Sequence, residues 1–367
     1  MYNFLKLKDM KFRSLFLAVL SGLAITAGFT SCSDDDDWDW SKEGSKVEMS
    51  ENRAFIINEG SMNKNNATMT YFDWTTDQTY KNDLFITQNG TLMGDVAQDI
   101  IVDGKNMYVI MSGSKCIYKM NTVGVAETRM SIPNELSDPR YGVIDGNYLY
   151  VSCYGGYVAK INKKTMTVEG QVEIGKNPEY IIKHDGKLYC TCSGWGADKR
   201  VAVIDIKSFD KATYFDVMDN PDRIIEVDGH VFVQGYGAYY NYPWGELNVK
   251  TGEFKELGNC SSWASYKNNL YLAYSATDWS TYETTTTLSA YNVNTGSTNN
   301  AFFKNAPAEL ATSSVYGVSV NDETGDIYVM TTDFTNNGQV YHFKSDGSFA
   351  GKFATTGINP RKIVFLD

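Results

Sequence analysis

Short runs of apolar residues, separated by turn residues, repeat along most of the chain. In residues 178–205 one apolar run is followed by Asp185-Gly186, a second apolar run, a longer loop and a third run. An Asp-Gly pair between two apolar runs supplies the positive φ angles that a tight β-hairpin requires. The pattern therefore predicts a strand, a hairpin turn, a strand, a loop and another strand.

This unit recurs about every 40 residues, with an aromatic-rich apolar run after each turn. A period of about 40 residues with four strands per copy is typical of the blades of a β-propeller. The turns of the six copies that are visible directly are Asp103-Gly104, Asp145-Gly146, Asp185-Gly186, Asp228-Gly229, Asn268-Asn269 and Glu323-Thr324-Gly325.

The two ends of the repetitive region together supply a seventh blade. Residues 54–57 match the second strand of a unit, residues 69–73 match the third, and residues 360–367 match the first. We therefore predict an all-β fold over residues 51–367: a seven-bladed β-propeller of four-stranded blades, closed by the C-terminal strand joining the N-terminal blade. Closure removes the exposed sheet edges. An irregular β-solenoid or a pair of β-sandwiches is the alternative.

The first 50 residues differ from the repeats. Basic residues precede an apolar run over residues 15–27, which is short for a membrane span and typical of a signal peptide. We expect a lipoprotein signal peptide over residues 1–31, translated from Met1 or Met10. Phe29-Thr30-Ser31-Cys32 resembles a loose bacterial lipobox and makes Cys32 the expected lipidation site, although an ordinary cleaved signal is the alternative. The acidic residues 32–50 predict a solvated tether.

The loops fall into two groups according to their position in the repeat. The first hairpin of each blade and the connection from its third to its fourth strand share one face, and they contain ordinary turn residues. The loops between second and third strands, and the links between blades, share the opposite face, which we call the loop-rich face. These loops are long, aromatic and relieved by glycine, which favours ligand recognition there. The ligand-binding residues expected in them are Asn58, Tyr154, Tyr157, Trp195, Arg200, Tyr236, Tyr239, Tyr240, Tyr242, Trp244, Trp279, Tyr282 and Phe334. The alternative is that these aromatic rings only pack the loops on one another.

The links between blades are expected to surround the centre of the same face. Their mixed charges and aromatic rings suit a ligand with amide and apolar parts. The alternative is that the arginines only pair with Asp99, Glu179 and Asp222. The link residues that we expect to contact a ligand are Arg140, Tyr141, Tyr180, Arg223, Trp263, Tyr316 and Arg361.

Composition and motifs give little support for catalysis or for nucleic-acid binding. The net charge of −11 argues against a nucleic-acid partner. His184 and His230 fall in hairpin turns of the opposite face, and His342 falls on a third strand. The hydrolase and metalloprotease motifs G-x-S-x-G and H-E-x-x-H do not occur. We therefore predict no enzyme, no catalytic residue, no metal and no cofactor. A metal-dependent, lactonase-type activity is the less favoured alternative, because arginines alternate with the acidic link residues.

Five further cysteines are spread over the repeats. Cys190 and Cys192 lie two apart on one predicted strand, so they face the same side but are poorly placed for a direct disulfide. Most of the five are expected to be small buried apolar residues. They are Cys116, Cys153, Cys190, Cys192 and Cys260.

The repeat P-x-x-I-x-x-D-G-x-L-Y-V, followed by V-x-x-I-D, resembles that of the YncE-type seven-bladed propellers. Residues 55–60 and 65–73 are similar to the Bacteroides branch of that superfamily, which includes the BtuG surface lipoproteins. Residues 33–37, directly after Cys32, resemble the export signal of Bacteroidetes surface lipoproteins. The resemblance implies a lipid-anchored protein on the exterior of the outer membrane, with a corrinoid (cobalamin, vitamin B12) as ligand. It also implies a TonB-dependent, BtuB-like transporter as partner, and it carries over no binding residues. A glycan or other nutrient as ligand, or a protein-interaction scaffold, are the alternatives.

Overall fold

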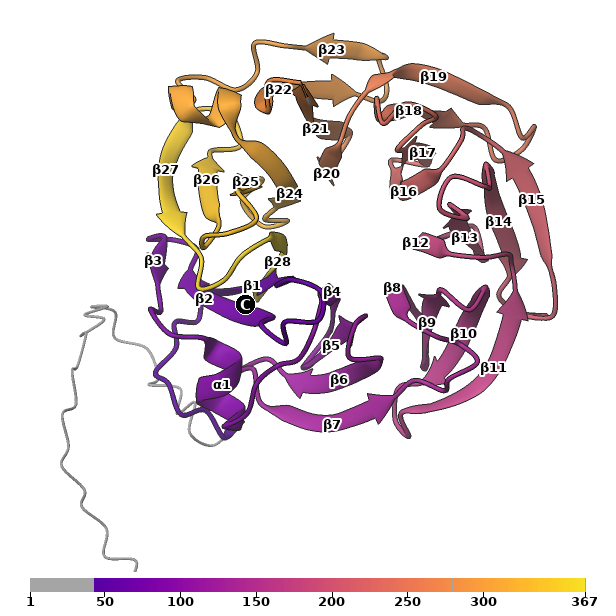
Figure 1. The fold of residues 1–367 in the computed structure, drawn as a ribbon, viewed down its shortest axis with the longest axis horizontal. Coiled ribbons are helices and arrows are strands. Elements are labelled where there is room, and N and C mark those ends of the chain that lie inside the picture. Colours follow the sequence, from indigo (N-terminus) through magenta and orange to yellow (C-terminus); the bar gives the residue numbers. More distant parts are fainter. Residues whose placement is uncertain (1–42, 279, 367) are drawn as a thin grey trace, which may run out of the picture. The chain divides into compact units, whose positions relative to one another are not determined.

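A computed structural model of the protein describes residues 43–278 and 280–366. These residues form seven four-stranded antiparallel sheets arranged in a ring (Figure 1). The predicted all-β, seven-bladed propeller is therefore confirmed. The signal peptide predicted for residues 1–31, the lipidation site Cys32 and the loop residue Trp279 lie outside the described residues.

The chain builds the ring blade by blade, with the first strand of each blade nearest the centre (Figure 1). From the centre outwards, blade one contains β28 (Pro360–Leu366), β1 (Arg53–Asn58), β2 (Thr68–Asp73) and β3 (Gln78–Thr79); blade two β4 (Ala97–Asp103), β5 (Asn106–Met111), β6 (Cys116–Asn121) and β7 (Ala126–Ser131); blade three β8 (Pro139–Asp145), β9 (Tyr148–Cys153), β10 (Tyr157–Asn162) and β11 (Thr167–Glu173); and blade four β12 (Pro178–His184), β13 (Lys187–Cys192), β14 (Arg200–Asp205) and β15 (Ala212–Asp216).

The remaining blades follow the same order, and two short helices occur in links between blades. Blade five contains β16 (Pro221–Val227), β17 (His230–Gly235), β18 (Pro243–Leu247) and β19 (Phe254–Asn259); blade six β20 (Ser262–Tyr266), β21 (Asn269–Asp278), β22 (Glu283–Asn292) and β23 (Ser297–Asn299); blade seven β24 (Ser314–Val320), β25 (Ile327–Thr332), β26 (Gln339–Phe343) and β27 (Phe349–Ala354); the helices are α1 (Leu84–Asn89) and the 3-10 helix η2 (Ala308–Thr312).

The C-terminal strand closes the ring as predicted. Strand β28 pairs antiparallel with β1, so that Phe55 lies opposite Val364. Ile363, Val364 and Leu366 are buried, and each belongs to one of the two apolar clusters that contain residues of blade one. The last described strand therefore contributes to the interfaces of blade one with both of its neighbours.

Apolar side chains from adjacent blades interdigitate to form the core. Between blades five and six, for example, Phe232, Trp244 and Tyr291 pack in one cluster with ring centroids 5.1–6.0 Å apart. Aromatic pairs at such distances add stability beyond the area that they bury. The aromatic-rich second strands of the sequence repeat are therefore largely core residues.

Residues 43–50 pack against the propeller, which corrects the last part of the predicted tether of residues 32–50; residues 32–42 lie outside the described residues. Met49 is buried in the cluster that joins blades one and two, and Val47 packs against that cluster. The backbone N–H of Lys46 donates to the Gln88 side chain in α1 at 2.8 Å. The sequence reasoning missed this contact because two apolar residues within an acidic segment give no periodic signal.

A buried histidine connects the last blade to the first. The His342 ring in β26 lies 2.7 Å from an Asp77 carboxylate oxygen in blade one and 3.0 Å from Asp326 in blade seven. It also stacks on Tyr328 with ring centroids 4.4 Å apart. Both carboxylates accept a hydrogen bond when both ring nitrogens carry a proton. His342 therefore has a structural role at the junction where the ring closes.

Replacing His342 with Phe is expected to lower the free energy of unfolding by about 1–3 kcal/mol, because the stacking is kept while the buried Asp326 and the partly buried Asp77 lose a hydrogen-bonding partner. His230→Phe is the matched control. Its ring is partly exposed and bonds to Glu246, so the change should stay within about 0.5 kcal/mol. Urea unfolding of both variants measures the difference, and equal losses would contradict the proposed role of His342.

Candidate functional site

The central strand begins with an irregularity in six of the seven blades. Its pairing with the neighbouring strand skips one or two residues near its start, and only β20 pairs with β21 without such a shift. A β-bulge bends the strand and changes the direction of the side chains at that point. The skipped residues are Gln98, Arg140, Tyr141, Glu179, Tyr180, Asp222, Tyr316 and Arg361.

The bulges bring these side chains together on the loop-rich side of the ring centre. We call this set, with Arg223 and Glu59, the polar floor. Arg140 donates to the Glu179 carboxylate at 2.9 Å and to the side-chain oxygen of Gln98 at 2.6 Å. The Gln98 amide donates in turn to the Tyr141 hydroxyl at 2.6 Å. Blades two, three and four are thereby joined by one chain of hydrogen bonds.

The same chain of hydrogen bonds continues into blades one and seven through Arg361. Its guanidinium donates to Glu59 and to the Tyr141 hydroxyl. The Tyr316 hydroxyl donates to the same Glu59 carboxylate at 2.7 Å. The rings of Tyr141 and Tyr180 are stacked with centroids 3.5 Å apart. The floor is therefore a connected layer of arginines, carboxylates and tyrosines.

Burial shapes the protonation states of this layer. It raises the pKa of Glu179, an effect that the neighbouring Arg140 opposes. Burial also raises the pKa of the Tyr141 and Tyr316 hydroxyls. The tyrosines therefore remain protonated near neutral pH and can serve as hydrogen-bond donors.

The ion pairs of the floor match the predicted alternative only in part. Arg140 does pair with Glu179. Arg361 pairs with Glu59, whereas Asp99 pairs with Lys362 at 2.7 Å. Arg223 and Asp222 are further apart, with a nitrogen-to-oxygen distance of 3.6 Å. Sequence spacing could not assign these partners, because they depend on which bulged side chains meet across the ring.

Large apolar side chains stand exposed in the loops around this floor. Their exposed fractions run from 59% for Phe334 to 89% for Tyr239. Each lies between the second and third strands of its blade, on the loop-rich face as predicted. We call this set the aromatic rim; its members are Trp195, Tyr239, Tyr240, Tyr282 and Phe334. Met62 is exposed in the corresponding loop of blade one.

Four rim residues adopt a backbone conformation that suits glycine or asparagine better. The φ angles of Trp195, Tyr240, Tyr282 and Phe334 lie between 53° and 62°. Side chains with a Cβ atom cost about 1–2 kcal/mol in this left-handed region. Such strain recurs where function requires a particular side chain. Residues outside the rim, such as Met166 and Phe209, share this conformation, so the φ angles show local strain and do not by themselves mark the rim as functional.

Other aromatic residues connect the rim with the floor. The Tyr154 ring meets Trp195 edge-on at 5.7 Å, and the Arg140 guanidinium lies 4.4 Å above it. Phe334 meets Tyr316 in the same way at 6.0 Å. In blade five, Tyr236 contacts both Tyr240 and Tyr242. The predicted aromatic residues in the loops of blades three, four and seven are therefore connected with the floor, and those of blade five contact one another.

Two predicted site residues are core residues instead. Trp244 lies in β18 with 3% of its surface exposed, because its ring packs against Phe232, Trp263 and Tyr291. Asn58 is fully buried at the end of β1, where its amide donates to Thr68 and Thr70. The prediction that they belong to the loop surface is wrong, since both strands continue further than the turn residues indicated.

Three other predicted residues are oriented by contacts away from the rim. Arg200 forms a bidentate pair with Asp198 and covers the Tyr214 ring of the outer strand β15. Tyr157 opens β10 and packs against the core between blades two and three. Trp263 is buried beside Trp244. Conversely, Glu59 was not among the predicted ligand contacts, although it follows Asn58 directly in the loop of blade one.

The histidines lie away from the floor, whereas the Cys190 thiol lies 3.9 Å from the backbone oxygen of Glu179. His184 ends β12 and His230 begins β17, both beside hairpin turns as predicted. The five cysteines of the repeats are buried and unpaired, which confirms the expectation of small core residues. Among residues 43–278 and 280–366, no group of three His, Cys, Asp or Glu is placed to hold a metal ion. No helix in this part of the chain is long and apolar enough to cross a membrane.

Solved structures of low sequence identity share this fold. A protein of unknown function from Desulfotomaculum acetoxidans matches with a TM-score of 0.57 and 12% identity, over 86% of this chain and 99% of that one. A protein of unknown function from Bacteroides caccae matches with a TM-score of 0.51 and 10% identity, over 86% of this chain and 99% of that one. Hydrazine synthase from Kuenenia stuttgartiensis matches with a TM-score of 0.55 and 14% identity, over 66% of this chain and 74% of that one. At these identities the likeness concerns the fold alone.

A comparison with curated proteins finds no match. A family model, in contrast, matches residues 52–352, which include most of the propeller. The chain belongs to the family described as Domain of unknown function (DUF5074).

Proposed function

We propose that this protein captures a small nutrient on its loop-rich face, and that the ligand is a corrinoid. The observation that carries the proposal is the aromatic rim around a floor of arginines, carboxylates and tyrosines. Exposed aromatic rings in strained loops give apolar contact area, and the floor supplies hydrogen-bond donors and acceptors.

A corrinoid suits such a surface because it is a broad, flat, apolar ring system fringed by amide groups. Ligand sites commonly combine apolar walls with a few well-placed polar groups. The three histidines lie in β12, β17 and β26, away from the rim, so ligation of cobalt by histidine is not part of the proposal. Affinity would come from shape and from contacts with the amide groups.

The remainder of the proposal concerns location and partner. Cys32 would carry the lipid anchor, and the acidic residues that follow it would direct the protein to the exterior of the outer membrane. There the loop-rich face would pass its ligand to a TonB-dependent transporter of the BtuB kind. Incorporation of labelled palmitate, lost in Cys32→Ser, tests the anchor. Digestion by protease added to intact cells tests the exposure.

Calorimetric titration of the purified protein with cyanocobalamin tests the ligand. We expect one ligand per chain and a dissociation constant below 1 μM, which corresponds to about −8 kcal/mol. Changing His184 or His230 to Ala on the opposite face should leave binding unchanged. An absence of heat at high micromolar protein would overturn the corrinoid proposal. Retardation in gels that contain a polysaccharide would then identify a glycan as the ligand, since aromatic rings also stack on sugars.

A further inference from the structure

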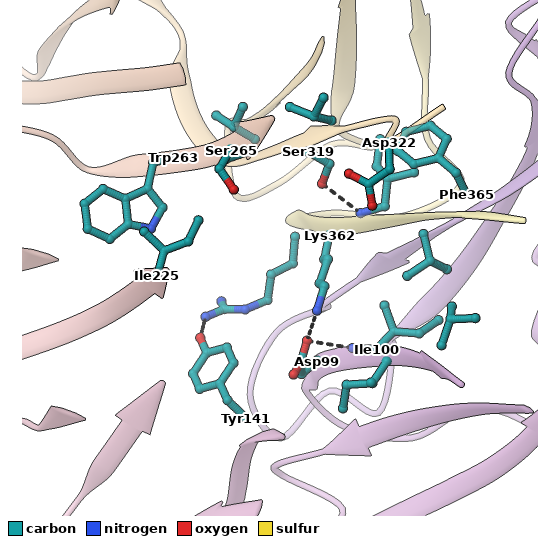
Figure 2. A pocket seen from close by; sticks show the side chains of 18 of the residues that line it. Asp99, Ile100, Tyr141, Ile225, Trp263, Ser265, Ser319, Asp322, Lys362 and Phe365 are labelled. Carbon is teal, nitrogen blue, oxygen red and sulfur yellow. Dashed lines mark hydrogen bonds and ion pairs between the residues drawn. The ribbon is translucent and has the colours of Figure 1, made fainter. Parts of the chain in front are cut away.

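A concave site lies within the ring, beneath the polar floor. It is a cavity of about 670 Å³ lined by the central strands. Figure 2 shows Trp263, Ile225, Tyr141, Asp99 and Lys362 around it, each from a central strand. This volume is within the range of about 300–1,000 Å³ that is usual for small-molecule sites.

The cavity shares floor residues with the loop-rich face but extends away from that face. Its lining begins at the floor with Tyr141, Tyr180 and Arg361, and it continues along the central strands to Asp322 and Glu323 in a first-hairpin turn. No member of the aromatic rim lines it. A ligand in this cavity would therefore lie on the other side of the floor from one held by the rim.

Two arginines at the floor end of the cavity have unused hydrogen-bond donors. The Nε atoms of Arg223 and Arg361 are both buried without a hydrogen-bond partner. Arg223 is the more weakly held of the two. Its Nη1 donates to Ser262 at 3.3 Å, and its Nε lies 3.6 Å from an oxygen of the Asp222 carboxylate, which is beyond hydrogen-bond distance. Buried donors without a partner are rare and mark a place where a ligand can supply the missing acceptor.

The other charged groups along the cavity do not supply that acceptor. Lys362 is paired with Asp99. Asp322 and Glu323 are exposed at the end remote from the floor. They disfavour a second negative charge at that end. The electrostatic arrangement therefore favours a ligand with one anionic group, placed beside Arg223.

Apolar and polar side chains share the walls between these two ends, and the apolar ones include a tryptophan and several branched residues. Trp263 and Ile224 are buried there, whereas Ile225 and Phe365 are only partly buried, and 36% of Val102 is exposed. Figure 2 shows the Trp263 ring and Ile225 adjacent to each other at one side of the cavity. A flat apolar group would displace water from these surfaces.

We propose that the central cavity is a second binding site, which takes a small organic monoanion with a flat apolar group. The carboxylate accepts from Arg223, and the apolar group packs against Trp263 and Ile225. The site shares floor residues with the surface proposed for the corrinoid, but it contains no residue of the aromatic rim.

A matched pair of probes tests the proposal on the unaltered protein. Indole-3-acetate and indole-3-acetamide have similar shape, but only the first carries a charge. Calorimetry is expected to show one indole-3-acetate bound per chain with a submillimolar dissociation constant. Indole-3-acetamide should bind at least tenfold more weakly. Absence of indole-3-acetate binding at 5 mM ligand, or equal affinity for the two probes, would overturn the proposal.

Variants then place the probe in the cavity. Arg223→Gln should lower the affinity for indole-3-acetate at least tenfold, whereas Arg129→Gln on the outer strand β7 should leave that affinity unchanged. Because Arg223→Gln could also disturb the fold, Ser265→Phe provides a second test, since its ring fills the cavity without altering an arginine. Binding of indole-3-acetate that survives in Ser265→Phe would overturn the assignment. Cyanocobalamin binding should be unchanged in Ser265→Phe, so failure of either proposal can be told from failure of the other.

Discussion

Arg140→Leu is expected to lower the free energy of unfolding by about 3–5 kcal/mol, because it leaves a buried carboxylate without its counter-ion. The side chains of Arg140 and Glu179 are only 15% and 7% exposed. Arg140 also donates to Gln98 and covers the Tyr154 ring. The change therefore removes one charge and two further contacts at the centre of the polar floor.

The loss of folding stability in Arg140→Leu should depend on pH. Burial already raises the pKa of Glu179, and Arg140 opposes that rise, so the variant raises the pKa further. A carboxyl group with a raised pKa in the folded state destabilises the fold as pH increases from its unfolded value through its folded value. The neutral carboxyl needs no counter-ion, so the difference between variant and wild type should be larger at pH 8 than at pH 4.5.

Urea unfolding at the two pH values measures this effect. Lys183→Met is the control, because Lys183 and Asp145 form an exposed pair with 42% and 36% of their side chains accessible. It should cost about 1 kcal/mol or less at either pH. Adding Glu179→Gln to Arg140→Leu should recover part of the stability, since no buried charge remains. A loss for Arg140→Leu as small as that of the control would refute the account of the floor.

Trp195→Asn and Tyr240→Asn are expected to lose ligand without losing stability. Both positions have φ angles near 55°, a region that asparagine adopts more readily than an aromatic residue. Relief of that strain should leave the free energy of unfolding unchanged or raise it by about 1 kcal/mol. Loss of an aromatic contact at the centre of an interface costs about 2 kcal/mol, or roughly 30-fold in affinity.

Two measurements on each variant separate binding from folding. Calorimetry with the ligand of the loop-rich face gives the affinity, and urea unfolding gives the stability. Tyr214→Asn is the control, because Tyr214 is also exposed but lies on the outer strand β15, away from the rim. It should leave the affinity unchanged. Unaltered affinity in both rim variants would mean that the rim does not contact the ligand, and a marked loss of stability would mean that these rings support the fold.

Much of the architecture follows from the sequence alone. An Asp-Gly turn between two apolar runs specifies a hairpin within a few residues, so the repeat and the faces on which its loops lie are local properties. The match of residues 360–367 to a first strand similarly predicts the pairing of β28 with β1. The same reasoning placed Trp195, Tyr239 and Phe334 in exposed loops.

Only the tertiary structure decided which side chains meet. The bulges at Tyr141 and Arg361 direct residues far apart in the chain to one point, so that Arg361 contacts Glu59 and Tyr141 rather than a sequence neighbour. Trp244 was predicted to be a surface residue, and its burial depends on an adjacent blade that supplies Tyr291. These contacts depend on the spacing and rotation of whole blades, which arise from packing across the ring. Hydrophobic periodicity within one blade carries no information about them.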